Sequence, residues 1–277
     1  MCLPETFETV QKQAEEKGLP HVDRRTLLLG GAVAAAAAAF PGVAEARLIP
    51  ANRIRDLTHL FREGFPTFGP PEPDRGPYAN YATEGFYSQM WTFHEHSGTH
   101  MDAPGHFFPT GRRTPQLLPR ELIRPLVVIN ISARAATNPD TMVTVDDLRR
   151  FQRGHGRIPN RSVVAMNSGW DAKVMDPLAF KGGAAFPNYH FPGWSEEAVD
   201  WLIRNRNITG IAVDTLSLDP GNSTTFPVHL RLLGADRYGL ENVKNLGTIP
   251  ARGTTIFVGV IPWEEGSGGP LRALAIW

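Results

Sequence analysis

Residues 94–106 read HEHSGTHMDAPGH and hold four of the nine histidines of the chain. Possible metal ligands occupy only the even positions of this stretch, at His94, His96, His100, Asp102 and His106. An extended backbone turns alternate side chains to the same side, so this spacing predicts an extended segment that gathers its polar groups on one face. Gly98, Pro104 and Gly105 oppose a helix here.

The donor types in this stretch favour a particular class of metal ion. Neutral imidazoles and a carboxylate are nitrogen and oxygen donors that suit Zn²⁺, Mn²⁺ or Fe²⁺. The single cysteine, Cys2, excludes an intramolecular disulfide and a thiolate zinc site. Gly98 would allow the backbone to pass close to an ion. A histidine-rich surface tract that only captures metal is the alternative interpretation.

The chain around this stretch shows alternating strand and helix patterns. Short runs rich in β-branched apolar residues predict buried strands at 126–131, 162–166, 208–213 and 254–261. Between them, Thr144 with Asp147 forms a capping box that predicts a helix through Phe151, and Ser195 can cap a longer helix. The alternation predicts an α/β or mixed α+β fold.

Composition predicts a globular protein with one main domain. The chain has 277 residues, of which 42% are hydrophobic and 20% charged, and no repeat or linker divides residues 47–277. The 28 basic and 28 acidic residues balance, so composition implies neither a nucleic-acid partner nor an anionic membrane. The prolines of residues 65–81 predict a surface loop or arm. No GxGxxG, GxxxxGK or GxSxG motif is present.

Residues 1–46 have the outline of a twin-arginine signal peptide. Arg24 and Arg25 precede a mildly apolar stretch of 14 residues, 27–40, and Ala44 and Ala46 provide the small residues of a cleavage site. A stretch of about 14 residues is too short to span a bilayer comfortably, so no stable membrane anchor is expected. The prediction is export by the twin-arginine machinery to the periplasm or beyond. An alanine-rich helix packed on the protein is the alternative.

Residues 96–106, HSGTHMDAPGH, resemble the HxGTHxDxPxH signature of the metal-dependent cyclase-family hydrolases, which include bacterial kynurenine formamidases and isatin hydrolases. Weaker matches follow in order, at residues 55–59, 167–170, 213–219, 229 and 238–243. The resemblance covers about residues 53–277. It implies that residues 47–277 form a single hydrolase domain with a swivelling β/β/α-type fold, and that the protein is a homodimer or higher homo-oligomer.

The same resemblance implies roles for individual residues. His96, His100 and Asp102 would bind a first divalent ion, Zn or Mn. Asp102, His229 and Glu241 would complete a second site where a second ion is present. His106, the last residue of the signature, corresponds to the proposed catalytic proton donor or acceptor. His94 and Glu95 lie outside the signature, as residues that support the ligands or as surface residues.

These inferences predict an enzyme that acts on a small molecule. A metal-activated water would hydrolyse a carbon–nitrogen amide bond in an aryl formamide or a cyclic amide. Trp170 and Phe107 are candidate substrate-binding residues for a planar aromatic substrate. Two alternatives stay open. One is a metal-dependent cyclase or dehydratase that acts without net hydrolysis, and the other is a catalytically silent protein that binds metal or ligand.

Overall fold

The computed structural model describes residues 49–277. The described chain divides into a main unit, residues 49–75 and 91–277, and a small hairpin unit, residues 76–90. The main unit combines helices with one large mixed sheet, so the predicted mixed α+β class is confirmed. The predicted signal peptide, residues 1–46, lies outside the described residues, and its assignment stays a prediction.

The large sheet closes into a barrel. Its strand order is β1-β12-β11-β5-β7-β9-β10-β4, and β4 pairs again with β12 to close the ring. These strands are β1 (Ile54–Asp56), β4 (His100–Asp102), β5 (Ile123–Asn130), β7 (Val163–Asn167), β9 (Gly210–Val213), β10 (Tyr238–Glu241), β11 (Thr254–Val260) and β12 (Gly268–Ile276). Neighbours from β5 to β10 run parallel, and the other pairs in this sheet run antiparallel.

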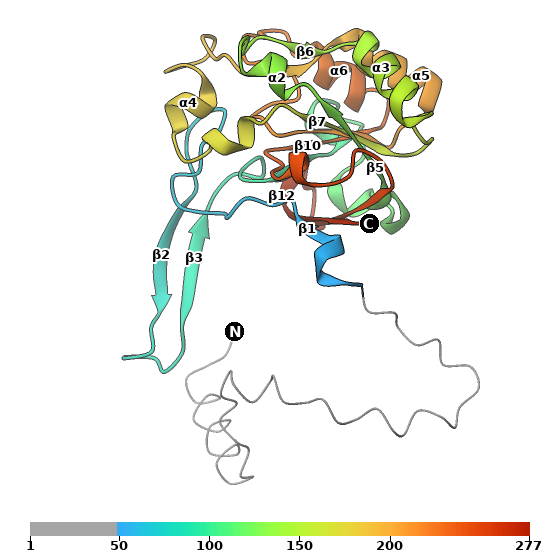
Figure 1. Cartoon of the computed structure of the whole chain (residues 1–277). Coiled ribbons are helices and arrows are strands. Elements are labelled where there is room, and N and C mark those ends of the chain that lie inside the picture. The colour runs from blue at the N-terminus through green and yellow to red at the C-terminus, as the bar shows by residue number, and fades with distance from the viewer. Residues whose placement is uncertain (1–48) are drawn as a thin grey trace, which may run out of the picture. The chain divides into compact units, whose positions relative to one another are not determined.

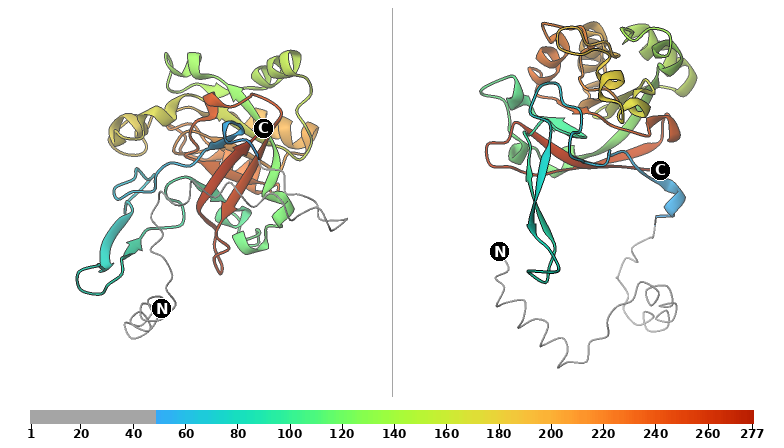
Figure 2. Two further views of the ribbon diagram at one scale, coloured as in Figure 1. Left: turned by 60° about the horizontal axis from the view of Figure 1, so that its bottom comes forward. Right: turned by 90° about the vertical axis from the view of Figure 1, so that its left-hand side faces the viewer.

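Helices connect the parallel strands and gather on one side of the sheet (Figures 1 and 2). They are α2 (Ser132–Ala135), α3 (Val145–His155), α4 (Pro177–Lys181), α5 (Glu196–Arg206) and α6 (Pro227–Leu233). Short 3-10 helices are η2 (Ala51–Arg53), η3 (Pro104–His106), η4 (Thr114–Gln116), η5 (Pro119–Glu121), η6 (Trp170–Lys173) and η7 (Leu246–Thr248). Two-residue strands β6 (Met142–Val143) and β8 (Gly193–Trp194) pair beside them.

The predicted strands and helix starts are confirmed. Each of the four apolar runs contains a strand of the barrel, β5, β7, β9 or β11. Thr144 caps α3, because its hydroxyl accepts from the Asp147 amide and its own amide donates to the Asp147 carboxylate. Ser195 caps α5 by accepting from the Ala198 amide. The sequence rule for N-caps therefore located both helices.

Alternation along the strands creates two buried layers. Val127, Val164 and Ile211 pack outward under α3 and α5, whereas Val128, Ala165 and Ala212 belong to the cluster inside the barrel. Because neighbouring residues of a strand point to opposite faces, strands buried on both sides read as continuous apolar runs. This explains why the sequence showed short apolar runs here and no alternating pattern.

Two expectations about backbone conformation need correction. The stretch 94–106 is not extended throughout, because Gly98 lies at φ +67° and only His100–Asp102 forms a strand before η3 begins. The proline-rich segment 65–81 is not wholly a loop, because β2 (Asp74–Ala79) pairs with β3 (Ser88–Thr92) in a separate two-stranded sheet. Pro77 fits there, since a two-stranded ribbon leaves edges that need no amide donor.

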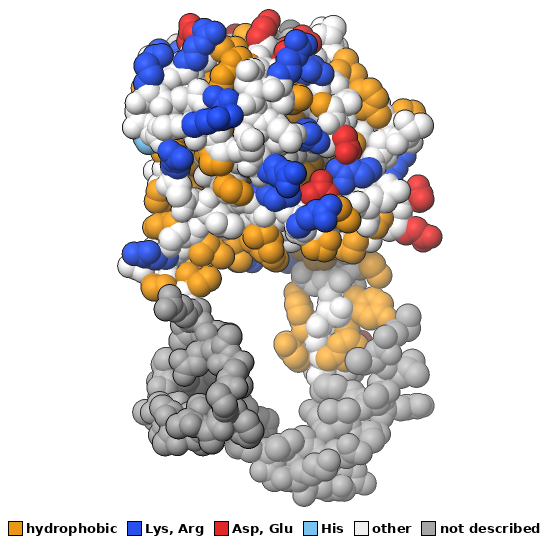
Figure 3. Space-filling model, turned by 90° about the vertical axis from the view of Figure 1, so that its right-hand side faces the viewer, with side chains coloured by type: hydrophobic (Ala, Val, Ile, Leu, Met, Phe, Trp, Pro, Cys, Tyr) orange, Lys and Arg blue, Asp and Glu red, His pale blue; other side chains and the backbone are white. Residues whose placement is uncertain are grey.

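Two surface properties complete the description. Among the described residues, no helix is long and apolar enough to cross a membrane. The face drawn in Figure 3 shows Lys and Arg side chains more prominently than Asp and Glu side chains. Since the whole chain has equal numbers of basic and acidic residues, charge is unevenly distributed over the surface.

Candidate metal centre

Strand pairing brings three of the predicted ligands together. In the antiparallel pair of β4 and β10, Glu241 lies opposite His100 and Gly239 opposite Asp102. The intervening Met101 and Leu240 point into the barrel core, so His100, Asp102 and Glu241 share the opposite face. His100 and Asp102 are only 2% and 1% exposed. The register of two short strands thus fixes three buried donors side by side.

His229 reaches the same place from α6. Its Nε2 lies 3.3 Å from Asp102 Oδ2 and 3.3 Å from Glu241 Oε1. On the other side of the ring, Nδ1 lies 2.6 Å from Asp219 Oδ2, and the Asp219 carboxylate also accepts from the amides of Val228 and His229. Asp219 therefore fixes both the start of α6 and the orientation of the His229 ring.

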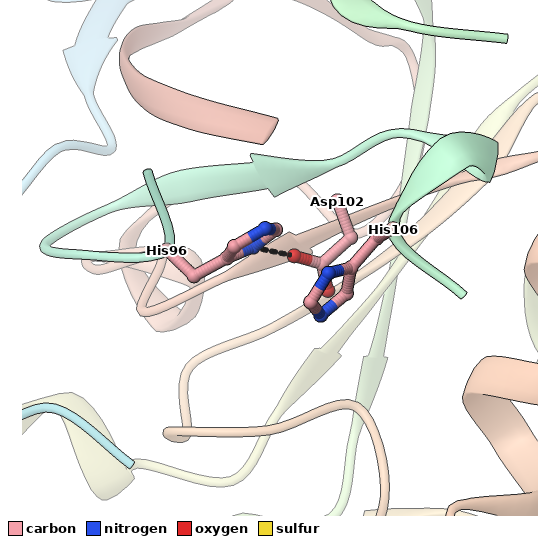
Figure 4. Close-up of side chains that lie close together, drawn as sticks. All are labelled: His96, Asp102 and His106. Carbon is pink, nitrogen blue, oxygen red and sulfur yellow. Dashed lines mark hydrogen bonds and ion pairs between the residues drawn. The ribbon is translucent and has the colours of Figure 1, made fainter. Parts of the chain in front are cut away.

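His96 stands at the edge of the cluster. Its Nδ1 lies 2.6 Å from Asp102 Oδ1, as the dashed line in Figure 4 shows, and its Nε2 lies 3.1 Å from Ser267 Oγ. Ser267 in turn donates to Glu95 Oε2 from its hydroxyl and its amide, both at 2.7 Å. A Cβ on Gly268 would approach His96 to 2.5 Å, so only glycine leaves the imidazole this position.

Gly98 has a different role from the expected one. A Cβ at this position would lie 2.5 Å from the Phe61 ring, and φ is +67°. The Gly98 carbonyl accepts from the Asn242 side chain at 2.8 Å and lies 2.9 Å from His100 Nδ1. Gly98 therefore makes the turn that orients His100, and the reason for glycine here is the contact with Phe61.

The pKa values in the cluster are strongly shifted. Burial by itself would lower the pKa of His100, but the carboxylates of Asp102 and Glu241 outweigh it and raise that pKa to about 10. The pKa of His229 is raised for the same reasons, with Asp219 as a further partner. Burial opposes ionisation of Asp102 and Glu241, yet their histidine neighbours hold both carboxyl pKa values below the usual range. The cluster therefore favours charged carboxylates at the position a cation would take.

Two buried atoms indicate that the cluster fits a divalent ion. Within residues 49–277, His100 Nε2 and Asp102 Oδ2 are buried and make no hydrogen bond. His100 Nε2 approaches Asp102 Oδ1 to 3.5 Å and Glu241 Oε2 to 3.3 Å without hydrogen-bond geometry. One ligand atom from each of these residues lies within 4.8 Å of the others, and the same holds for His96, Asp102 and His106. Unpaired buried donors in such a group suit a metal ion.

His106 lies beside the ligands and has the opposite pKa shift. It follows Asp102 through η3, and its ring stacks on His96 with centroids 3.7 Å apart and an interplanar angle of 26° (Figure 4). Burial lowers its pKa to about 4, an effect that the nearby Asp102 opposes. The neutral imidazole is therefore the form present at neutral pH, with ring nitrogens free to accept a proton.

A small cavity of about 80 Å³ opens onto the cluster. Its lining includes His94, Phe68, Leu216 and Ser217 together with His96, His100, Asp102, His229 and Glu241. Phe107 stacks on His229 at 4.9 Å and an angle of 25°. Trp170 does not line the cavity, because its indole N–H donates to the Phe180 carbonyl within a separate buried cluster. The structure thus brings Phe107, but not Trp170, against a predicted ligand.

Sequence reasoning gave no role to Asp219 and Ser267. Asp219 had a signal, because it ends the run 213–219 ten residues before His229, but a loop contact of this kind has no fixed spacing. Ser267 is 171 residues from His96 and carries no local pattern. Glu95 was expected to be either a supporting or a surface residue, and it contacts Ser267 and Gly268.

Comparisons with known proteins agree with this geometry. The sequence model of the family described as "Putative cyclase" matches residues 55–220. An isatin hydrolase of Roseibium aggregatum is 32% identical over 217 residues, which cover 74% of this chain and 81% of that protein.

Solved structures give the same result. Isatin hydrolase A from Ralstonia solanacearum superposes with a TM-score of 0.75 and 35% identity, covering 80% of this chain and 91% of that one. An isatin hydrolase bound to the product analogue thioisatinate gives a TM-score of 0.76 and 29% identity over 81% and 92% of the two chains. This chain therefore belongs to the putative cyclase family, as a metal-dependent hydrolase similar to the isatin hydrolases.

Proposed function

We propose that the protein hydrolyses the carbon–nitrogen bond of a cyclic amide fused to an aromatic ring. The observation that carries this proposal is the buried group of His100, Asp102 and Glu241, in which two polar atoms have no partner within residues 49–277. The isatin hydrolases among its relatives give the bond type, since isatin is a cyclic amide on a benzene ring. The substrate is thus a small molecule.

The proposed metal ligands are those that the sequence predicted. His96, His100 and Asp102 hold a first divalent ion, Zn or Mn, and Asp102, His229 and Glu241 hold a second where one binds. When bound, the ion supplies a water of lowered pKa and polarises the substrate carbonyl. Asp219 orients His229, and Ser267 orients His96, so both rings are held before the ion arrives.

His106 is the proposed proton carrier. Because burial lowers its pKa to about 4, the ring is neutral near pH 7 and accepts a proton from the attacking water. It then returns the proton to the departing amide nitrogen, so the ring ends neutral again. Its stacked position on His96 keeps it next to the ligands.

Aromatic side chains around the cavity support a planar substrate. Phe68 lines the cavity and lies 5.7 Å from Phe226 between ring centroids. Phe226 contacts Phe107 at 6.0 Å and Phe186 at 6.1 Å. A ring of such side chains accepts a flat aromatic molecule by stacking and edge contacts. Trp170 is left outside this group by its position under Phe180.

A substrate comparison tests the proposal. Purified protein, metal-loaded or stripped by chelation, is mixed with isatin, with an aryl formamide and with an unstrained linear anilide. We expect opening of the isatin ring, measured as carboxylate and proton release, only with metal. Unchanged turnover after complete metal removal would contradict the metal-dependent mechanism. Cleavage of the formamide alone would instead make the enzyme an arylformamidase.

We also propose export of the folded protein to the periplasm by the twin-arginine machinery. The support is the order of the arginine pair, the apolar stretch and the small residues in 1–46. Replacing Arg24 and Arg25 by Lys should retain the protein in the cytoplasm, as fractionation would show. Unchanged export of that variant would remove the assignment.

A further inference from the structure

A cavity lined by arginines lies at the other edge of the sheet from the metal centre. Its volume is about 480 Å³, and five arginines and two carboxylates line it, which gives a formal charge of +3. The arginines are Arg112, Arg120, Arg124, Arg161 and Arg237. Because the chain as a whole is neutral, this charge is a local feature.

Strand direction separates this cavity from the metal centre. Thr209 and Arg237 directly precede β9 and β10, and Arg161 lies two residues before β7. The cavity therefore lies at the amino ends of these parallel strands. Glu241 is the last residue of β10, so the metal centre lies at the carboxyl end of the same strand. A four-residue strand is about 10 Å long, which places the two sites on opposite edges.

The acidic residues of the cavity neutralise only one arginine. Glu121 accepts two hydrogen bonds from Arg112, at 2.8 and 3.0 Å, and Asp236 accepts a third at 2.8 Å. Both carboxylates are thus committed to Arg112. The hydrogen bond from Arg112, together with its charge, holds the pKa of Glu121 below the usual range, so this acid stays charged.

The other guanidinium groups have unused donors. Within residues 49–277, the side chains of Arg120, Arg124 and Arg161 form no ion pair or hydrogen bond. Arg237 donates to Asn207 Oδ1 and to the Asp236 carbonyl, neither of which carries a full charge. In the same described region, Nε of Arg124 and Nε of Arg237 are buried without a partner. Buried donors in native proteins nearly always have a partner.

We propose that this cavity binds a small anion that carries phosphate groups. Guanidinium groups stay protonated at physiological pH, so an anion relieves their mutual repulsion and pairs their donors. The planar fork of arginine matches two oxygens of one phosphate group. The volume lies in the range of about 300–1,000 Å³ that small-molecule sites have. A nucleic-acid backbone is disfavoured, because it follows an extended basic stripe and not a single concave site.

Calorimetric titration of the full chain with inorganic phosphate at constant ionic strength tests this proposal. We expect saturable binding of one phosphate per chain. Arg124→Gln and Arg237→Gln should each weaken it by roughly 10-fold or more, because each removes a charge-assisted hydrogen bond. Arg149→Gln is the matched control, since Arg149 is an exposed arginine on α3 that does not line the cavity. It should bind phosphate like the unchanged protein.

Further variants keep the result decisive. Phosphate could also bind at the metal centre, so His100→Ala must leave the measured affinity unchanged. If Arg124→Gln fails to fold, Arg161→Gln replaces it, because Arg161 is exposed. The proposal is overturned if no saturable binding occurs, if chloride at equal ionic strength gives the same signal, or if the cavity variants bind as tightly as the control. Binding of single-stranded DNA without binding of phosphate would also overturn it.

Discussion

Two imidazoles in the metal centre have opposite pKa shifts for one physical reason. His100 contacts two carboxylates, which raise its pKa to about 10 against the effect of burial. His106 is also buried but has no such close partner, so burial dominates and lowers its pKa to about 4. A bound ion replaces the proton on His100, whereas His106 stays neutral and free to carry protons.

Replacing His106 by Ala separates proton transfer from metal binding. We expect the variant to keep its metal while kcat falls by about 10²- to 10⁴-fold, the usual range for loss of a general acid or base. A substrate with a good leaving group should suffer less, because its departing nitrogen needs little protonation. Metal analysis beside steady-state kinetics measures both. Stoichiometric loss of metal in this variant would make His106 a ligand and would refute the assigned role.

Ser267 and Glu95 should affect metal affinity without contacting the ion. Ser267→Ala removes the partner of His96 Nε2, and Glu95→Gln weakens the acceptor that orients the Ser267 hydroxyl. Loss of such support lowers metal affinity by roughly 10- to 100-fold in other proteins. Titration of metal into chelator-treated protein measures the effect, and Ser132→Ala, on α2, is the control. Equal affinities in all four proteins would show that the contacts only pack the loop.

The sequence predicted the donor residues better than their supports. His96, His100 and Asp102 lie in one short stretch, so a local signature identifies them. Asp219 and Ser267 act through tertiary contacts whose spacing along the chain is not fixed by any local rule. Trp170 illustrates the opposite error of method, because an aromatic residue has no sequence mark that separates a cavity wall from a core position.

At the level of elements, two glycines make a matched test of backbone conformation. Gly98→Ala places a methyl group at φ +67° and 2.5 Å from the Phe61 ring, so we expect a loss of about 1–3 kcal/mol in the free energy of unfolding. Gly154→Ala lies in α3, where no atom lies within 4 Å, and should stabilise the protein by about 0.5–1 kcal/mol. Urea denaturation measures both changes. An unchanged Gly98→Ala protein would contradict the turn described here.

Strands and helix starts could be read from the sequence, but the closure of the barrel could not. Apolar runs mark β5, β7, β9 and β11 because both faces of these strands are buried. The strand β4 has only three residues, and its pairing with both β10 and β12 depends on tertiary register. Even positions in residues 94–106 suggested a long strand, yet the chain turns at Gly98 and forms η3 after Ala103. Period-two spacing alone does not prove an extended backbone.

For the whole molecule, buried histidines set how the stability of metal-free protein depends on pH. The folded pKa values of His59 and His106 are about 4, below the ordinary 6.5, chiefly because of burial. The unfolded chain therefore binds protons that the folded chain does not, and stability falls as pH drops from about 6.5 to 4. His100 has the opposite sign, so its contribution is complete below pH 6.5 and is lost as pH rises to about 10.

His59→Phe tests the acid side of this dependence away from the proposed ligands. His59 Nε2 is buried without a partner among residues 49–277, and its ring packs 5.9 Å from Phe65. The unchanged protein should lose stability between pH 6.5 and 4.5, and the variant should lose about 1–2 kcal/mol less. Urea denaturation of chelator-treated protein at both pH values gives the comparison. Parallel losses in the two proteins would show that His59 titrates normally.

The central claim is that the buried cluster on β4, α6 and β10 holds the ion on which hydrolysis depends. Its most direct test is elemental analysis together with isatin hydrolysis on three proteins: the unchanged chain, His100→Ala and His190→Ala. His190 is the control, since it pairs with Asp140 and does not line the site cavity. We predict that His100→Ala loses metal and activity together, whereas His190→Ala keeps both. Full metal content and full activity in His100→Ala would contradict the account.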